Sequence, residues 1–163
     1  MTTQYSTQYT QLFVTVPATP LSSTDMHGVV RIAFFQTTQS GAGSAPSSMA
    51  LVKLPPGRVR LLLGISRAWV DWTTASATLD LGWDAYTNLD GTAVVADPDG
   101  LVDGLNVDTA GYFNFEGALT AVKAKGGTWD FESKTGVVIR ATSQDVALAN
   151  NDVAHGYLCY VQD

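Results

Sequence analysis

The chain has 163 residues, which fits one domain that can bury a sizeable core. Charged residues make up only 15% of it and the net charge is −6, whereas soluble proteins typically carry about 25% charged residues. No Lys or Arg lies between Arg67 and Lys123, where nine acidic residues fall, so this composition argues against nucleic-acid binding.

The N-terminal segment, residues 1–11, is polar and uncharged and repeats Thr-Gln-Tyr. It has no basic region and no apolar centre, so we expect no secretory signal and synthesis in a cytoplasm. The composition predicts an extended arm that is disordered alone or ordered against a partner. Its candidate partner-binding residues are Thr2, Gln4, Tyr5, Gln8 and Tyr9. We expect deletion of residues 2–11 to weaken partner binding more than folding.

Residues 12–163 consist of short apolar runs separated by turn residues, a pattern typical of a sandwich or barrel. The fold class predicted is all-β: a single β-sandwich domain, jelly-roll-like or related, with one or two short helical turns. Strand order stays open. The expected strands are residues 12–16, 29–37, 49–54, 58–70, 78–83, 112–115, 128–131, 137–142 and 156–161.

Alternation of apolar and polar residues supports the two clearest strands. Leu79, Leu81 and Trp83 share one face of residues 78–83. In residues 58–70, the odd positions from Val59 to Ile65 share a face, and Gly64 permits a bend or bulge.

Helical signals are few. One short helix is expected to start at Asp97, with Asp97 as N-cap and Pro98 in the first turn. A second is expected over residues 116–123. No apolar stretch approaches the roughly 18 residues of a membrane span, so no membrane interaction is expected.

No residue pattern predicts catalysis, a cofactor or a resident metal. The acids at Asp97, Asp99 and Asp103 suit calcium by type, but their spacing departs from an EF-hand loop and helix capping explains them better. His155 and Cys159 would lie about 13 Å apart along one strand, too far for base activation of the thiol. Cys159 is the single cysteine and lies in an apolar run, so no disulfide framework exists and the thiol is expected to be buried.

Two further patterns have a functional and a structural interpretation. The carboxylate pairs Asp80/Asp84 and Asp130/Glu132 suit a glycosidase by type, but acids on a solvated strand face are commoner. Four tryptophans, if aligned on an exposed face, would form a sugar-stacking platform; placement of two or three of them in the core is the better prediction. The tryptophans are Trp69, Trp72, Trp83 and Trp129.

Residues 51–61, L-V-K-L-P-P-G-R-V-R-L, resemble a phrase found in small head proteins of tailed bacteriophages. Residues 77–83, A-T-L-D-L-G-W, and the Asp- and Gly-containing loop at residues 84–92 extend the resemblance. Together the similar segments fall within residues 29–110, and the N-terminal arm is not part of them.

The resemblance implies a head decoration, or cement, protein that binds the outer surface of a capsid. It implies the major capsid protein as partner, self-association as a homotrimer and no catalysis. The alternatives are another structural part of the particle, such as a tail or fibre-associated sandwich or the shell subunit itself, and a carbohydrate-binding module that uses exposed tryptophans.

Overall fold

The computed structural model describes every residue except 1–3, 5, 23–25, 27 and 116–118. A short helical segment precedes the strands, and a second short helix lies between the eighth and ninth strands. In chain order the elements are α1 (Thr7–Tyr9), η1 (Thr10–Val14), β1 (Val30–Thr38), β2 (Ser47–Leu54), β3 (Gly57–Asp71), β4 (Thr78–Trp83), β5 (Tyr86–Thr87), β6 (Ala93–Val94), β7 (Asp97–Asn106), β8 (Gly111–Asn114), α2 (Thr120–Ala124), β9 (Thr128–Ser133), β10 (Val137–Ser143) and β11 (Val153–Gln162).

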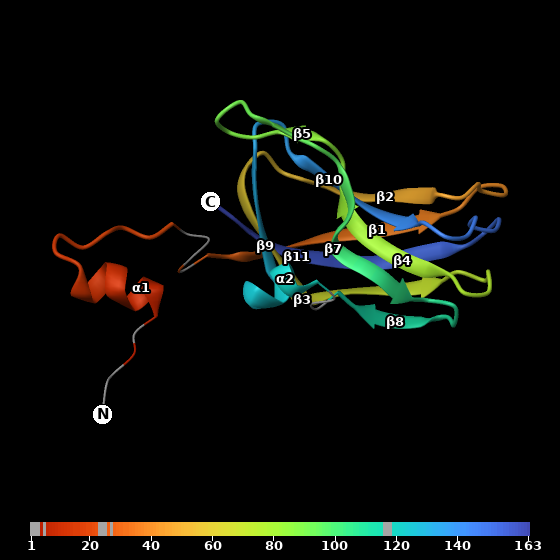
Figure 1. The fold of residues 1–163 in the computed structure, drawn as a ribbon, viewed down its shortest axis with the longest axis horizontal. Coiled ribbons are helices and arrows are strands. Elements are labelled where there is room, and N and C mark those ends of the chain that lie inside the picture. The colour runs from red at the N-terminus through yellow and green to blue at the C-terminus, as the bar shows by residue number, and fades with distance from the viewer. Residues whose placement is uncertain (1–3, 5, 23–25, 27, 116–118) are drawn as a thin grey trace.

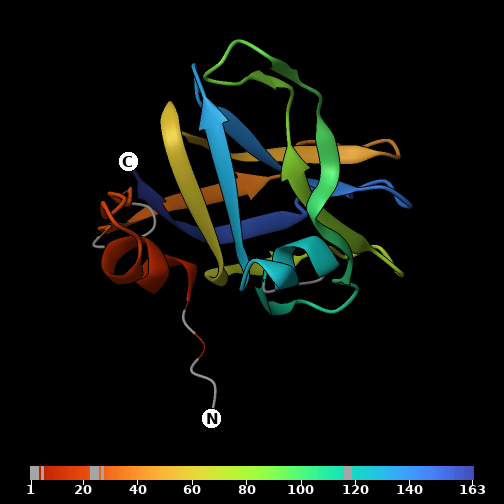
Figure 2. The ribbon, with the colours of Figure 1, turned by 60° about the vertical axis from the view of Figure 1, so that its left-hand side comes forward.

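Two antiparallel sheets form the sandwich (Figure 1). The five-stranded sheet has the order β1-β11-β3-β8, and β9 also pairs with β3, at the opposite end of that long strand from β8. The four-stranded sheet has the order β2-β10-β4-β7. The hairpin β5–β6 extends from one end (Figure 2). The predicted all-β sandwich is therefore confirmed.

The core lies between the inner faces of these two sheets. Leu61 and Leu63 from β3 face Leu79 and Leu81 from β4, and all four are at most 1% exposed. Burial of side chains of this size stabilises the fold by about 1.5–3 kcal/mol each. The shared buried face predicted for Leu79, Leu81 and Trp83 is thus confirmed, whereas the prediction of a half-buried strand is wrong, because Asp80 and Gly82 on the other face are buried as well.

Strand β3 changes face at a bulge, as Gly64 suggested. Val59, Leu61 and Leu63 are buried, whereas Ile65 is 55% exposed. The register against β11 jumps between Leu62 and Arg67. The expectation that Ile65 shares the buried face is wrong, because the extra residues of the bulge reverse the alternation beyond Gly64.

The region from Asp97 onwards is a strand, and the predicted helix start there is wrong. Strand β7 pairs with β4 through two register shifts, with Asp97 opposite Trp83. Gly82 makes this approach possible: a Cβ at that position would overlap the backbone of Asp97 and Pro98. Long-range pairing therefore overrides the local Asp-Pro signal, and both faces of β4 are covered.

From Thr7 onward the N-terminal arm is helical, where an extended segment was expected. The Ser6 hydroxyl accepts a hydrogen bond from the Tyr9 N–H at 3.1 Å, and the Thr15 N–H donates to the Thr10 carbonyl at 2.8 Å. The predicted strand at residues 12–16 is wrong for the same reason. We call residues 7–14 the arm helix; none of its residues is buried, and it stands off one end of the sandwich (Figure 1).

The second helical prediction is correct in its C-terminal part. α2 covers Thr120–Ala124 and buries Val122, while residues 116–118 of the expected helix lie outside the described residues. None of the helices in the described part of the chain is long and apolar enough to cross a membrane.

Candidate interaction surfaces

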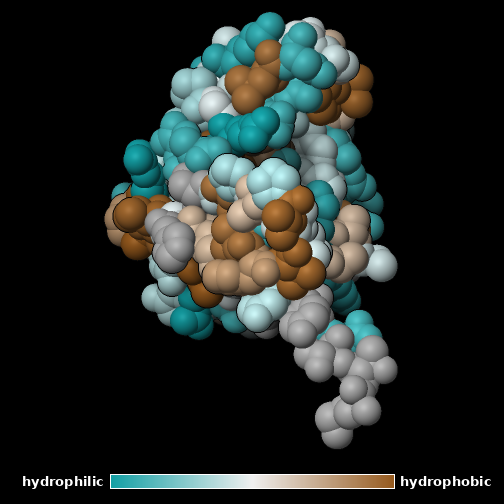
Figure 3. Space-filling view, turned by 90° about the vertical axis from the view of Figure 1, so that its left-hand side faces the viewer, coloured by the Kyte–Doolittle hydropathy of each residue, from teal (hydrophilic) through white to brown (hydrophobic). Residues whose placement is uncertain are grey.

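The arm helix presents apolar side chains to solvent. Phe13 is 68% exposed and Val16, just beyond the helix, is 93% exposed. The rings of Tyr9 and Phe13 lie 5.1 Å apart, so they form one aromatic ridge. Figure 3 views this end of the molecule, where apolar side chains gather on the surface. Such a concentration on a small chain makes this end a candidate interaction surface.

The predicted partner-binding residues are only partly placed by the structure. Gln4 is exposed before the arm helix, whereas Gln8 and Tyr9 lie within it. Thr2 and Tyr5 lie outside the described residues. The sequence interpretation selected the polar residues and Tyr9 but missed Phe13 and Val16, which were assigned to a core strand.

The outer face of β1 is a second apolar surface. Val30, Ile32 and Phe34 alternate on it, and Phe34 is 75% exposed. Phe35, the next residue, points to the opposite face and is buried, as the two-residue period requires. β1 is also a terminal strand of its sheet, so one side of its backbone has no partner strand in the described sheet order.

An aromatic groove of about 570 Å³ continues from β1 across the same sheet. Phe34 packs edge-on against Tyr157 at 6.1 Å, and Trp69 packs edge-on against Tyr112 at 5.0 Å. His155 lies opposite Trp69 in the strand register and lines the groove. The groove is therefore mainly aromatic with one imidazole.

The four tryptophans have separate roles. Trp72 and Trp83 are buried, which confirms the predicted core placement for two of them. Trp129 stacks on Trp83 at 5.6 Å, and the Lys125 ammonium lies 4.1 Å from its ring centroid. Trp69 is the tryptophan that lines the aromatic groove. A platform of several aligned tryptophans is therefore wrong.

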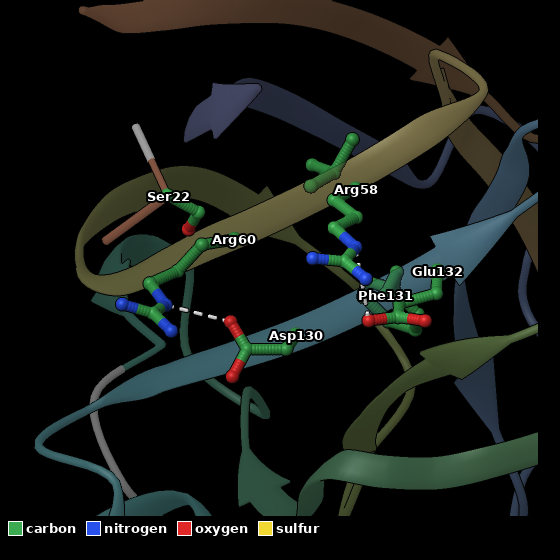
Figure 4. A pocket seen from close by; sticks show the side chains of 7 residues that line it. Ser22, Arg58, Arg60, Asp130, Phe131 and Glu132 are labelled. Carbon is green, nitrogen blue, oxygen red and sulfur yellow. Dashed lines mark hydrogen bonds and ion pairs between the residues drawn. The ribbon is translucent and has the colours of Figure 1, made fainter. Parts of the chain in front are cut away.

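A charged crevice of about 160 Å³ is lined by Ser22 and by side chains of the neighbouring strands β3 and β9 (Figure 4). Arg60 pairs with Asp130 at 2.6 Å, and Arg58 pairs with Glu132 at 3.3 Å. These are cross-strand neighbours, so the ion pairs hold the sheet register. The Asp130/Glu132 carboxylates are therefore engaged by arginines, and the crevice is structural in character.

Asp84 and Arg140 form a two-point ion pair on the four-stranded sheet. The guanidinium Nε and Nη2 donate to the carboxylate at 2.8 and 2.7 Å. These hydrogen bonds outweigh partial burial and hold the pKa of Asp84 below its usual value of 3.8. The paired carboxylate therefore contributes stability above pH 3.8 that is lost as the pH falls through the lower folded-state pKa.

Replacement of Asp84 by Asn removes this charge while keeping the side-chain size. We expect the free energy of unfolding at pH 7 to fall by about 1 kcal/mol or less, because both groups are about one-third exposed. The difference from the wild type should shrink as the pH falls below 3.8. Chemical denaturation between pH 7 and pH 2 measures it; a difference independent of pH would contradict the assignment.

Two other aspartates behave in the opposite way. Burial raises the pKa of Asp80, although its carboxylate accepts a hydrogen bond from the Gly104 N–H at 2.7 Å. Burial and a hydrogen bond with Asp99 raise the pKa of Asp97. The ionised form of either group therefore destabilises the fold above its ordinary pKa.

The single thiol of the chain belongs to the core. Cys159 is buried, as predicted, and its burial raises the pKa of the thiol. Its backbone N–H donates to the Ser66 hydroxyl at 2.9 Å, inside the β3 bulge. Among the described residues no group of three or more His, Cys, Asp or Glu is arranged to hold a metal ion. The distinctive surfaces are thus apolar and aromatic.

Comparisons with known proteins give limited likenesses. No family model matches the sequence, and no curated protein is similar to it. Among solved structures, the structure of the infectious bursal disease virus Gt strain matches 84% of this chain with 13% identity and a TM-score of 0.45. A VP2 subviral particle of the same virus matches 82% with 13% identity and a TM-score of 0.42. This chain spans about a third of those chains (33% of each). Likenesses of this degree carry no argument about family or function.

Proposed function

We propose that this chain is a non-catalytic structural protein of a virus particle, a head decoration protein that binds the outer surface of a capsid. It acts as a homo-oligomer. The resemblance of residues 51–92 to phage head proteins implies that this oligomer is a trimer. The major capsid protein is its partner, and no cofactor takes part.

The observation that carries this proposal is the apolar arm helix standing off the sandwich. Phe13 and Val16 are 68% and 93% exposed, so most of their apolar surface is available for contact with another molecule. Each side chain of this size is worth about 1.5–3 kcal/mol when fully buried. Multiplied over many copies on a symmetric shell, a modest contact per copy gives firm attachment.

The sandwich itself suits permanent contact with neighbours. Its charged fraction of 15% is low, and β1 and the aromatic groove add apolar area on one face. Interfaces are depleted in charged residues at their centre and enriched in Tyr, Trp and Phe. The residue composition of this face therefore supports a protein-binding role.

Co-sedimentation with empty shells tests the proposal. The purified chain is mixed with undecorated shells of the phage whose genome encodes it, at salt concentrations from 20 mM to 1 M. We expect saturable binding and a higher melting temperature of the shells. Absence of binding at every salt concentration would overturn the capsid-surface role.

A second candidate function rests on Trp69. An aromatic groove with a half-exposed Trp and a neighbouring Tyr112 suits the apolar face of a sugar ring. A carbohydrate-binding module would show glycan-array binding that Trp69→Ala removes while the fold, followed by circular dichroism, is kept. Such a result, together with no binding to shells, would favour carbohydrate binding over capsid decoration as the function of this chain.

A further inference from the structure

The carboxyl group of Asp80 is buried on the outer face of the four-stranded sheet. Asp80 is 3% exposed, and its alternation with Leu79 and Leu81 turns it away from the core between the sheets. Strand β7, which lies beside β4 at the end of the described sheet order, helps to cover it (Figure 1). The Gly104 N–H of β7 donates to this carboxylate at 2.7 Å, so a side chain of β4 binds the backbone of the edge strand.

A bulge in β7 stands directly opposite Asp80. The register between β4 and β7 shifts between Leu79 and Leu81, so Asp103 and Gly104 together face the single residue Asp80. Gly104 has φ +65°, in the left-handed region that favours glycine, and this bend directs its N–H to the carboxylate. The same bulge brings the negative charge of Asp103 close to that of Asp80.

The groups around Asp80 are acids, without a cation to compensate them. Burial raises the pKa of Asp80, and the charges of Asp103, Asp99 and Asp145 raise it further, against the single backbone hydrogen bond. Neither β4 nor β7 contains a Lys or Arg. On the neighbouring strand β10, Arg140 is engaged in its two-point ion pair. The ionised form of Asp80 is therefore held at a cost to the fold.

Strand β10 does not stabilise the charge of Asp80 from its other side. Thr142 lies directly opposite Asp80 in the antiparallel register and is 5% exposed. Its Oγ1 forms no hydrogen bond with any residue that the structure describes. The Gly104 N–H is thus the one donor that the described residues give to this buried carboxylate.

A second pair of carboxyl groups lies where β7 begins. Asp97 stands opposite Trp83 of β4, and burial together with a hydrogen bond with Asp99 raises the pKa of Asp97. Two carboxyl groups share a hydrogen bond only when one of them holds a proton. Contacts near both ends of β7 therefore depend on protonated carboxyl groups.

We propose that the edge strand β7 is a pH-sensitive element, fastened to β4 when Asp80 and the Asp97–Asp99 pair hold protons and loosened when they ionise. Ionisation leaves charges that only water can solvate, and water reaches them when β7 lifts from β4. Two features permit this movement: β7 ends the described sheet order, and its pairing with β4 is interrupted by two register shifts.

The loosening is a transient local opening, because the middle of β7 is anchored in the core. Leu101 and Val102 are at most 1% exposed, and they pull the strand back after each opening. Since the folded-state pKa of Asp80 is raised, its contact is strongest below the ordinary value of 3.8 and weakens as the pH rises through the folded-state value. This behaviour of β7 is independent of attachment to a shell.

Hydrogen–deuterium exchange of the β7 amides in Asp80→Asn tests the proposal. Asn has the shape of a protonated carboxyl group, keeps an oxygen for the Gly104 N–H and cannot ionise. At pH 7 we expect β7 amides that exchange about fivefold more slowly than in the wild type and a melting temperature about 2–4 °C higher. At pH 3, where Asp80 of the wild type is protonated, the two proteins should agree.

Asp99→Asn is a second test, because its amide supplies the hydrogen bond to Asp97 without a proton and should also slow exchange in β7 at pH 7. The matched control is Asp108→Asn, which removes the same charge from an exposed position just beyond β7. It should leave β7 exchange as in the wild type. Exchange in Asp80→Asn that is unchanged or faster at pH 7, slower by the same factor at pH 3, or matched by the control would overturn the proposal.

Discussion

Replacement of Tyr9 and Phe13 together by Ser is expected to weaken binding to shells by about tenfold or more per copy. Both rings are exposed on the arm helix, so the free chain loses little when they are removed. If either ring is buried on the shell, the loss of about 1.5–3 kcal/mol exceeds the 1.4 kcal/mol that corresponds to a tenfold change in affinity. Titration of shells with labelled protein measures the effect.

The matched control for this variant is Val95→Ser. Val95 is also strongly exposed, but it lies in the loop before β7, far along the chain from the arm. It should bind shells as the wild type does. A Tyr9/Phe13 variant with unchanged affinity and an unchanged melting temperature would show that the arm helix is not the shell-binding element.

Trp72→Ala should destabilise the fold more than any other single tryptophan replacement, by about 3–5 kcal/mol. Trp72 is 1% exposed and packs in the core between the sheets. In a chain of this length such a loss lowers the melting temperature by roughly 10 °C. Thermal unfolding followed by circular dichroism measures it.

Trp72→Phe and Trp69→Ala provide the comparison. The Trp72 Nε1 has no hydrogen-bond partner among the described residues, so Phe removes an unsatisfied group along with some volume and should be clearly milder than Ala. Trp69→Ala removes mainly its edge-on contact with Tyr112, worth about 0.5–1.5 kcal/mol. If Trp69→Ala were the more destabilising change, the division into core and surface tryptophans would be wrong.

The sandwich and most of its strands are predictable because they rest on local alternation and turn residues. Leu79 and Leu81 show the two-residue period, and the structure buries both. The bulge near Gly64 is also visible in the sequence. The length of the bulge cannot be predicted from the sequence, because the register between β3 and β11 depends on a long-range hydrogen bond from the Cys159 backbone N–H to the Ser66 hydroxyl.

The mistaken predictions have two physical causes, a long-range strand pairing in one case and local hydrogen bonds in the other. The sequence at Asp97 and Pro98 predicts a helix start. These residues instead lie on a strand that pairs with β4, because Gly82 has no side chain and leaves room for their backbone. Residues 12–16 read as a strand from their apolar content, yet the Ser6 cap and the local hydrogen bonds make the preceding turn helical. A short apolar run is ambiguous between helix and strand when no neighbour is specified.

The candidate surfaces could be predicted only in part. Tyr9 is a sequence prediction that the structure places on an exposed helix, and its role in binding stays a prediction. The aromatic groove joins residues far apart in the chain, such as Trp69 with Tyr112. Such surfaces follow from strand order, which the sequence leaves open.

Direct location of the chain in the intact particle tests the central proposal most plainly. Cryo-electron microscopy of the phage, compared with a mutant that lacks the gene, gives a difference map of the head and tail. We expect difference density on the outer surface of the capsid, as clusters of three sandwich domains with the arm ends facing the shell. Density confined to the tail, or no difference in the particle, would contradict a decoration role.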